Sequence, residues 1–261
     1  MNRLIQAELL KIRTTRLWWG LIIGVVAGSA LFAGVDAGLA GRGANGLPGV
    51  DDPAMVRTIY TAGIGIAYLI TLSLGIITMA GEYRQATMTA TVLSSPRRER
   101  IVLAKLAALI VAGMGYGVLA VLTSVAVGAP IIMARGGSAR LLSDGVPRAL
   151  ALAALAVALW AVVGLGIGTL IRNQVVALLV AIGVAWLAEP LLSLALNALH
   201  WGSVARFLPS SATSALISPP SNNGGFATDY LPWWAAALVL LGYAAVSGAL
   251  GAAITLRRDI T

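Results

Sequence analysis

The sequence predicts an all-α integral membrane protein that crosses the bilayer six times. Of its 261 residues, 59% are hydrophobic and only 11% are charged, whereas soluble domains carry about 25% charged residues. The chain therefore has too few polar side chains to cover a soluble globule of its size. A helix needs about 20 mostly apolar residues to cross the hydrocarbon core. Six stretches meet this length: 17–35, 58–80, 104–134, 148–171, 175–196 and 232–256.

The distribution of lysine and arginine predicts which side of the membrane each loop faces. Cytoplasmic loops carry an excess of these residues, and six spans place both termini on one side. Most of the 18 basic residues share that side, so the sequence predicts cytoplasmic termini. They are Arg3, Lys11, Arg13, Arg16, Arg84, Arg97, Arg98, Arg100, Lys105, Arg172, Arg257 and Arg258. The residues on the opposite side are Arg42, Arg57, Arg135, Arg140, Arg148 and Arg206.

The composition excludes most catalytic chemistry. The chain has no cysteine and one histidine, His200, which removes thiolate nucleophiles, zinc–thiolate sites and histidine clusters. It lacks the GxxxxGK[ST] pattern with which a P-loop holds phosphates. The glycine-rich stretch GLGIGTL at 164–170 has no lysine and lies in an apolar span. We therefore expect a non-catalytic chain with no cofactor or metal of its own, whose basic residues face membrane lipids rather than nucleic acid.

Residues 1–16 are expected to form an interfacial helix before the first span. Ile5, Leu9 and Ile12 fall on one stripe at helical spacing, with Glu8 at its edge. Such a helix would lie on the inner leaflet with its apolar stripe buried. The alternative is a basic, poorly ordered leader.

Pairs of glycines at helical spacing mark three of the spans. Such pairs allow helix backbones to approach closely. Packing within one subunit is the expected role, and contact between two subunits is the alternative. The pairs are Gly24 with Gly28, Gly113 with Gly117, and Gly164 with Gly168.

A polar segment, GEYRQATMTATVLSSPRRER at 81–100, interrupts the apolar sequence between the second and third spans. Its central part is uncharged, and a short helix on the membrane surface is more plausible there than an isolated strand. Ser95 and Pro96 are typical of the start of a helix. From spacing alone, an ordinary cytoplasmic loop rich in positive charge is the favoured explanation.

Three motifs in order carry a resemblance to a known family. The start AELLKIRTTRLWW, the loop GEYRQATMTATVLSSPRRERIVLAK and the ending TLRRDIT resemble ABC-2 type transporter permeases, those of actinobacteria in particular. The resemblance covers essentially the whole chain. It implies that 81–100 is a coupling loop whose helix docks on a separate ATP-hydrolysing subunit. The family's Gly-Glu falls on Gly81 and Glu82 and its basic residue on Arg84, and we add Thr87 and Thr89 to the expected coupling residues.

The same resemblance implies an assembly and a direction of transport. Two permease copies, identical or different, would form a dimer with spans 1 and 5 at the interface. Two copies of the ATPase would hold ATP and magnesium, and a substrate such as a drug, peptide or lipid would move outward across a bacterial plasma membrane. It also implies that residues 1–16 are a connecting helix beside the ATPase.

Glu189 is a carboxylate well inside an apolar span, and Pro190 follows it. An ionisable residue inside the membrane is costly and faces protein or water. Pro190 also leaves the carbonyl of Trp186 without its helical donor. We predict that Glu189, Trp186 and Tyr68 line the translocation path or its outer gate. The alternative is that Glu189 is a structural acid paired with a polar group of a neighbouring element.

The segment 197–231 is too apolar to be a plain loop, and Pro209 and the Pro219–Pro220 pair divide it. Two short helices that dip into the outer leaflet would explain both features, and the resemblance implies re-entrant helices here.

Two other classes of protein could have six spans. An ATP-independent channel or secondary transporter would have no use for a coupling loop. A membrane-embedded enzyme would need a cluster of acids, bases or metal ligands that the sequence lacks. The function expected is therefore the permease subunit of an ABC exporter, with the substrate left open.

Overall fold

The structure is a computed structural model that describes residues 2–42, 48–84, 98–143, 145–171, 173–217 and 231–257. All regular elements within these ranges are helices. They are α1 (Asn2–Thr14), α2 (Leu17–Leu39), α3 (Pro53–Thr61), α4 (Ile64–Arg84), α6 (Arg98–Ala134), α7 (Val146–Leu170), α8 (Gln174–Gly183), the π-helical turn η1 (Val184–Ala188), α9 (Glu189–Ala198), α10 (Gly202–Ala205), α11 (Pro209–Ile217) and α12 (Trp233–Arg257).

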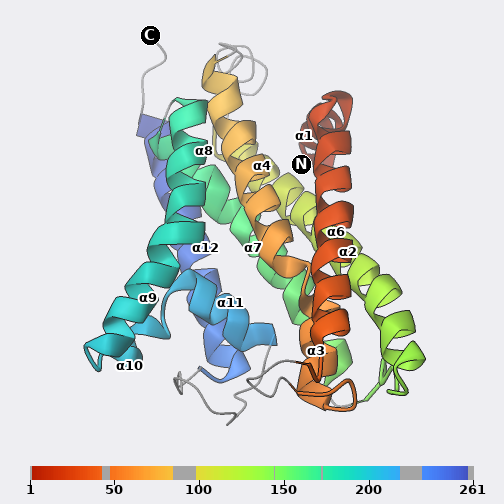
Figure 1. Cartoon of the computed structure of the whole chain (residues 1–261). Coiled ribbons are helices and arrows are strands. Elements are labelled where there is room, and N and C mark those ends of the chain that lie inside the picture. Colours follow the sequence, from red (N-terminus) through yellow and green to blue (C-terminus); the bar gives the residue numbers. More distant parts are fainter. Residues whose placement is uncertain are drawn as a thin grey trace.

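Six of the described segments are long and apolar enough to cross a membrane, which confirms the predicted fold class. They are Leu17–Leu39, Pro53–Gly81, Arg100–Ala134, Val146–Leu170, Gln174–Ala198 and Trp233–Leu250. Figure 1 shows α1 and the last turns of α12 at one end of the bundle, and α3 and α10 at the other. We refer to these as the α1 end and the α3 end.

Helix α7 is the centre of the bundle. It packs against α4, α6, α11 and α12, and each of the four buried apolar clusters contains at least one of its residues. Over an apolar stretch of 18 residues in α7, 67% of the residues are buried, against 22% in the corresponding stretches of α2 and of the α8–α9 span. The outer helices are therefore arranged around α7, while α2 and α8–α9 keep most of their apolar surface uncovered.

Glycines allow α4 and α7 to touch backbone to backbone. A Cβ on Gly164 of α7 would collide with the carbonyl oxygen of Leu72 in α4, and one on Gly168 would lie 2.9 Å from the carbonyl oxygen of Ile76. The hydroxyl of Thr71 donates to the carbonyl oxygen of Val157 at 2.9 Å across the same contact. This glycine pair therefore packs within the subunit.

The other two glycine pairs also face helices of the same chain. A Cβ on Gly28 of α2 would lie 2.6 Å from Ile66 of α4, and one on Gly117 of α6 would lie 2.7 Å from the Cα of Ala154 in α7. Packing within one subunit, the first of the two roles considered for these pairs, is what the structure shows.

Gly113→Ala should therefore destabilise the bundle, with Gly115→Ala as a matched control in the same helix. The new methyl at Gly113 would lie 2.7 Å from the Cα of Ala158, whereas a methyl at Gly115 meets nothing within 4 Å. Forced overpacking costs about 1–3 kcal/mol, while an unhindered Gly→Ala change in a helix gains up to about 1 kcal/mol. Thermal unfolding of the purified proteins in detergent measures the difference. Equal midpoints for the two variants would contradict the close contact between α6 and α7.

The second span is interrupted near the α3 end, where the sequence predicted one continuous helix over 58–80. Helix α3 ends at Thr61 and α4 begins at Ile64. Between them, the backbone N–H of Gly63 donates to the hydroxyl of Ser124 in α6 at 3.2 Å. Gly63 also lies so close to Ser29 of α2 that a Cβ would be 2.5 Å from the Ser29 Cβ. The break is possible because a side chain replaces the missing helical hydrogen bond.

Arg135 joins α6 to α2 at the α3 end. Its guanidinium donates to the carbonyl oxygens of Ala37 at 2.5 Å and of Ala40 at 2.7 Å. These are among the last carbonyls of α2, which have no donor within the helix. The sequence marked Arg135 as a basic residue of the outer side, and its structural role is to cap the first span.

Candidate functional site

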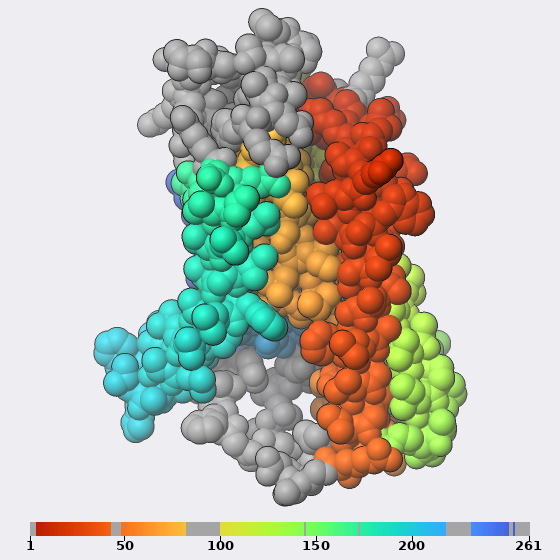
Figure 2. Space-filling model, turned by 45° about the horizontal axis from the view of Figure 1, so that its top comes forward, coloured from red at the N-terminus to blue at the C-terminus, as the bar shows by residue number. Residues whose placement is uncertain are grey.

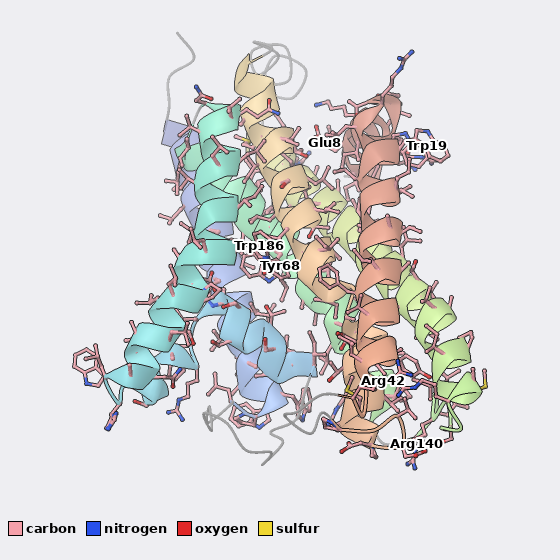
Figure 3. The ribbon with its side chains drawn as sticks, viewed as in Figure 1. Glu8, Trp19, Arg42, Tyr68, Arg140 and Trp186 are labelled. Atoms are coloured by element: carbon pink, nitrogen blue, oxygen red, sulfur yellow. The ribbon has the colours of Figure 1, made fainter. Side chains whose placement is uncertain are left out.

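Two groups of polar residues lie at different levels of the bundle. One is at the α1 end, where α1, the last turn of α4 and the start of α6 are found (Figure 1). The other surrounds α11 and contains residues predicted for a translocation path. In Figure 3, Glu8 lies near the α1 end, Tyr68 and Trp186 lie at mid-height, and Arg42 and Arg140 lie near the α3 end.

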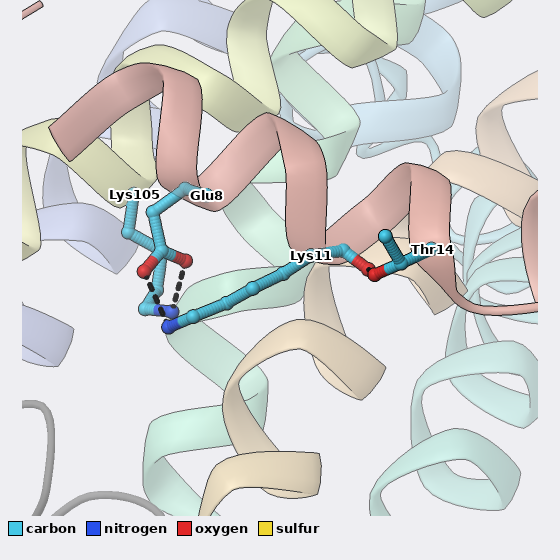
Figure 4. A network of polar contacts seen from close by, with 4 residues as sticks. All are labelled: Glu8, Lys11, Thr14 and Lys105. Atoms are coloured by element: carbon cyan, nitrogen blue, oxygen red, sulfur yellow. Dashed lines mark hydrogen bonds and ion pairs between the residues drawn. The ribbon is translucent and has the colours of Figure 1, made fainter. Parts of the chain in front are cut away.

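At the α1 end, Glu8 forms two ion pairs. Its Oε2 lies 2.7 Å from Nζ of Lys105 in α6, and its Oε1 lies 2.7 Å from Nζ of Lys11 in the same helix (Figure 4). The Glu8 and Lys105 side chains are only 7% and 4% exposed, whereas that of Lys11 is 49% exposed. The contact between Glu8 and Lys105 is therefore a buried bridge between α1 and α6.

Electrostatics keep Glu8 charged. Burial raises the pKa of Glu8, but the positive charges and hydrogen bonds of Lys105 and Lys11 oppose it, and the net effect is a pKa below the usual value. Glu8 is therefore a carboxylate at neutral pH, and it neutralises a lysine that is buried near the beginning of the third span.

The predicted helix over residues 1–16 is present as α1, and its apolar stripe faces the protein. Ile5, Leu9 and Ile12 are half-buried, and Ile12 packs against the main core cluster. The sequence placed Glu8 at the edge of this stripe but did not pair it with Lys105. The available signal was a carboxylate beside an apolar stripe and a lysine just inside an apolar span.

The predicted coupling residues lie partly inside the described chain. Gly81, Glu82 and Arg84 belong to the last turn of α4, and a Cβ on Gly81 would meet nothing within 4 Å. The side chains of Glu82 and Arg84 lie outside the described residues, as do Thr87, Thr89 and the predicted Ser95–Pro96 helix start. Their role in coupling stays a prediction.

The second polar group ties the short helix α11 to the spans. The ring of Tyr68 in α4 stacks on Trp160 of α7, with centroids 4.8 Å apart. The indole N–H of Trp160 donates to the hydroxyl of Thr213 in α11 at 3.0 Å, and this hydroxyl donates to the carbonyl oxygen of Pro209 at 2.8 Å. The stacked rings of Tyr68 and Trp160 thus connect α4 and α7 to α11 through the hydrogen bond of Trp160.

Glu189 holds the first turn of the same helix. Its carboxylate is buried, and Oε2 accepts a hydrogen bond from the backbone N–H of Ser210 at 2.8 Å. Ser210 is in the first turn of α11, where backbone N–H groups lack helical acceptors and a negative charge is favourable. Glu189 therefore has a polar partner in a neighbouring element, as expected if it were a structural acid. Its role in transport stays a prediction.

Trp186 does not share this environment. Its side chain is 67% exposed, and it lies in η1, the π-helical turn that precedes Pro190. The N–H of Glu189 donates to the carbonyl oxygen of Val184 there, which is the local loosening expected before a proline. Of the three residues predicted for the path, Glu189 contacts α11 directly, Tyr68 is linked to α11 only through Trp160, and Trp186 lies on the surface.

These features define a multi-pass α-helical membrane protein with polar groups at helix junctions. Among the residues that the structure describes, no three His, Asp or Glu side chains are grouped so that they could hold a metal ion. The family model for the ABC-2 family transporter protein matches residues 4–186, and the chain therefore belongs to this family. The comparison with curated proteins found no match. Members of the family are membrane components of transport systems that work with an ABC ATPase.

Proposed function

We propose that the chain is the permease subunit of an ABC exporter, and that two permeases form the path for a substrate expelled by two copies of a partner ATPase. Family membership supports the permease role. The observation that carries the coupling role is the arrangement at the α1 end: α4 ends and α6 begins there, beside α1. A partner on that side would lie beside the last turn of α4 and the beginning of α6.

The uncovered helices support a dimer. Figure 2 shows α2, α4 and the α8–α9 span on one face of the molecule, with α4 between the other two. Large apolar side chains stand exposed along both outer helices, for example Ile23 and Leu31 of α2 and Leu179 of α8. A second permease packed against both outer helices would cover apolar surface that they leave exposed, and α4 would face the space between subunits.

The test is affinity purification of the tagged permease from detergent-solubilised membranes of its native host. We expect an ABC ATPase to copurify and to hydrolyse ATP in the complex. A permease that purifies intact without an ATPase, and that transports without ATP, would contradict the proposal and favour a channel or secondary transporter.

The proposal places both termini in the cytoplasm, and single-cysteine labelling tests this directly because the chain has no cysteine. A cysteine at Asn223, between α11 and α12, should react with an impermeant maleimide in intact cells. A cysteine at Gln6, which is exposed on α1, should react only after permeabilisation. The reverse pattern would invert the topology that the basic residues predict.

A further inference from the structure

The buried pair of Glu8 and Lys105 joins two segments that are far apart in the sequence. Glu8 belongs to α1, and Lys105 lies about two turns after the beginning of α6. Removing one member of a buried ion pair is costly because the other charge keeps its desolvation penalty without the attraction. The contact therefore favours one arrangement of α1 and α6 over arrangements in which the two helices separate.

The two residues of this pair belong to helices that are connected to different parts of the chain. Helix α6 follows directly after the segment 85–97 that the proposed function assigns to ATPase docking. Helix α1 is followed after only two residues by α2. A second contact joins α6 directly to the first span, because the hydroxyl of Tyr116 in α6 donates to the carbonyl oxygen of Trp18 in α2 at 3.4 Å. A displacement of the start of α6 can thus reach the first span through α1.

We propose that Glu8 and Lys105 are positioning residues that lock α1 onto the start of α6, so that α1 and the first span move together with α6 when the ATPase acts on the preceding segment. The inference rests on the proposed function for the source of the movement. The lock itself is a property of the permease alone and can be tested without the ATPase.

Lys11 provides a matched control. Its Nζ lies at the same 2.7 Å distance from the Glu8 carboxylate as that of Lys105. Lys11, however, is half-exposed and belongs to the same helix as Glu8, so its pairing with Glu8 holds no two helices together. Lys11→Met should therefore displace α1 much less than Lys105→Met does, although it removes an ion pair of equal length.

The first measurement reports the docking of α1. A single cysteine replaces Ile12, whose side chain packs against the core, and its reaction with an impermeant maleimide is timed in permease reconstituted into nanodiscs. We expect Glu8→Gln and Lys105→Met each to raise the rate about tenfold, and Lys11→Met to leave it within about twofold. The charge-swapped pair, Glu8→Lys with Lys105→Glu, should return the rate toward that of the unaltered protein. Unchanged rates in both single variants would overturn the lock.

The second measurement reports coupling in the complex with the ATPase. Both single variants should retain the ATPase on purification and lower permease-dependent ATP turnover about tenfold, with recovery in the charge-swapped variant. If α1 is released in the labelling assay but turnover is unaffected, the role in coupling is overturned. If the unaltered permease retains no ATPase, the proposed function fails, while the labelling assay still decides whether the pair locks α1. Should Glu8→Gln fail to insert, Lys105→Met and the charge-swapped pair carry the same test.

Discussion

Replacement of Glu82 by alanine is expected to leave the permease in the membrane and to release the ATPase from it. Glu82 is in the last turn of α4, beyond most of the apolar residues that direct insertion. We predict that Glu82, near the position where α4 ends, meets a basic group of the partner and passes the partner's movement into α4. Removing one charge of a buried interfacial pair costs roughly 2–5 kcal/mol, which corresponds to about 30-fold or more in affinity.

A small series of variants separates charge from position. Glu82→Gln removes the charge alone and should have the milder effect, and Arg84→Ala and a double change of Thr87 and Thr89 to alanine test the rest of the predicted contact. Arg42→Ala serves as control, because Arg42 is an exposed residue near the opposite end of the bundle (Figure 3). ATPase copurification and ATP turnover are measured for each. If Glu82→Ala, Arg84→Ala and the double variant all match the unaltered protein, 81–100 is an ordinary positively charged loop.

The spans could be predicted from the sequence because their signal is length and hydropathy, which need no knowledge of neighbours. The same holds for α1, whose apolar stripe depends only on helical periodicity, and for the distorted turn before Pro190. The glycine pairs were recognisable by their spacing, but the spacing could not predict which helix packs against each pair. A close approach to another helix leaves the same pattern in the sequence whether that helix belongs to the same subunit or to a second one.

The polar contacts were the least predictable part, for three different physical reasons. Glu8 and Lys105 are close only because α1 folds back onto α6, and no local pattern records that. Arg135 counted as one positive charge on the outer side, whereas its partners are backbone carbonyls of another helix. Glu189 was conspicuous as an acid inside an apolar span, but its partner is the backbone N–H of Ser210, which no side-chain pattern marks.

Glu189→Gln should keep the protein folded and still impair transport if the charge of Glu189 lies on the path. The amide oxygen of glutamine can accept the hydrogen bond that Ser210 N–H now donates at 2.8 Å, so α11 should stay in place. The substitution replaces one acceptor oxygen by another and changes the free energy of unfolding by about 1 kcal/mol. We therefore expect the thermal midpoint to shift by only a few degrees. Transport should fall about tenfold, because the ionisable carboxyl group of a buried residue inside the membrane span is lost.

Two further variants decide between a structural and a transport role. Glu189→Leu removes the acceptor altogether and leaves the Ser210 N–H without its partner, which costs about 1–3 kcal/mol. Thr213→Val removes the acceptor of Trp160 at the same helix without changing any charge, and it should lower stability by a similar amount. If transport follows stability across all three variants, Glu189 only holds α11. If Glu189→Gln is as stable as the unaltered protein and transports normally, the path role is wrong. Two results together would show that the charge of Glu189 itself serves translocation. Glu189→Gln must be stable and lose transport, and Thr213→Val must transport in proportion to its folded fraction.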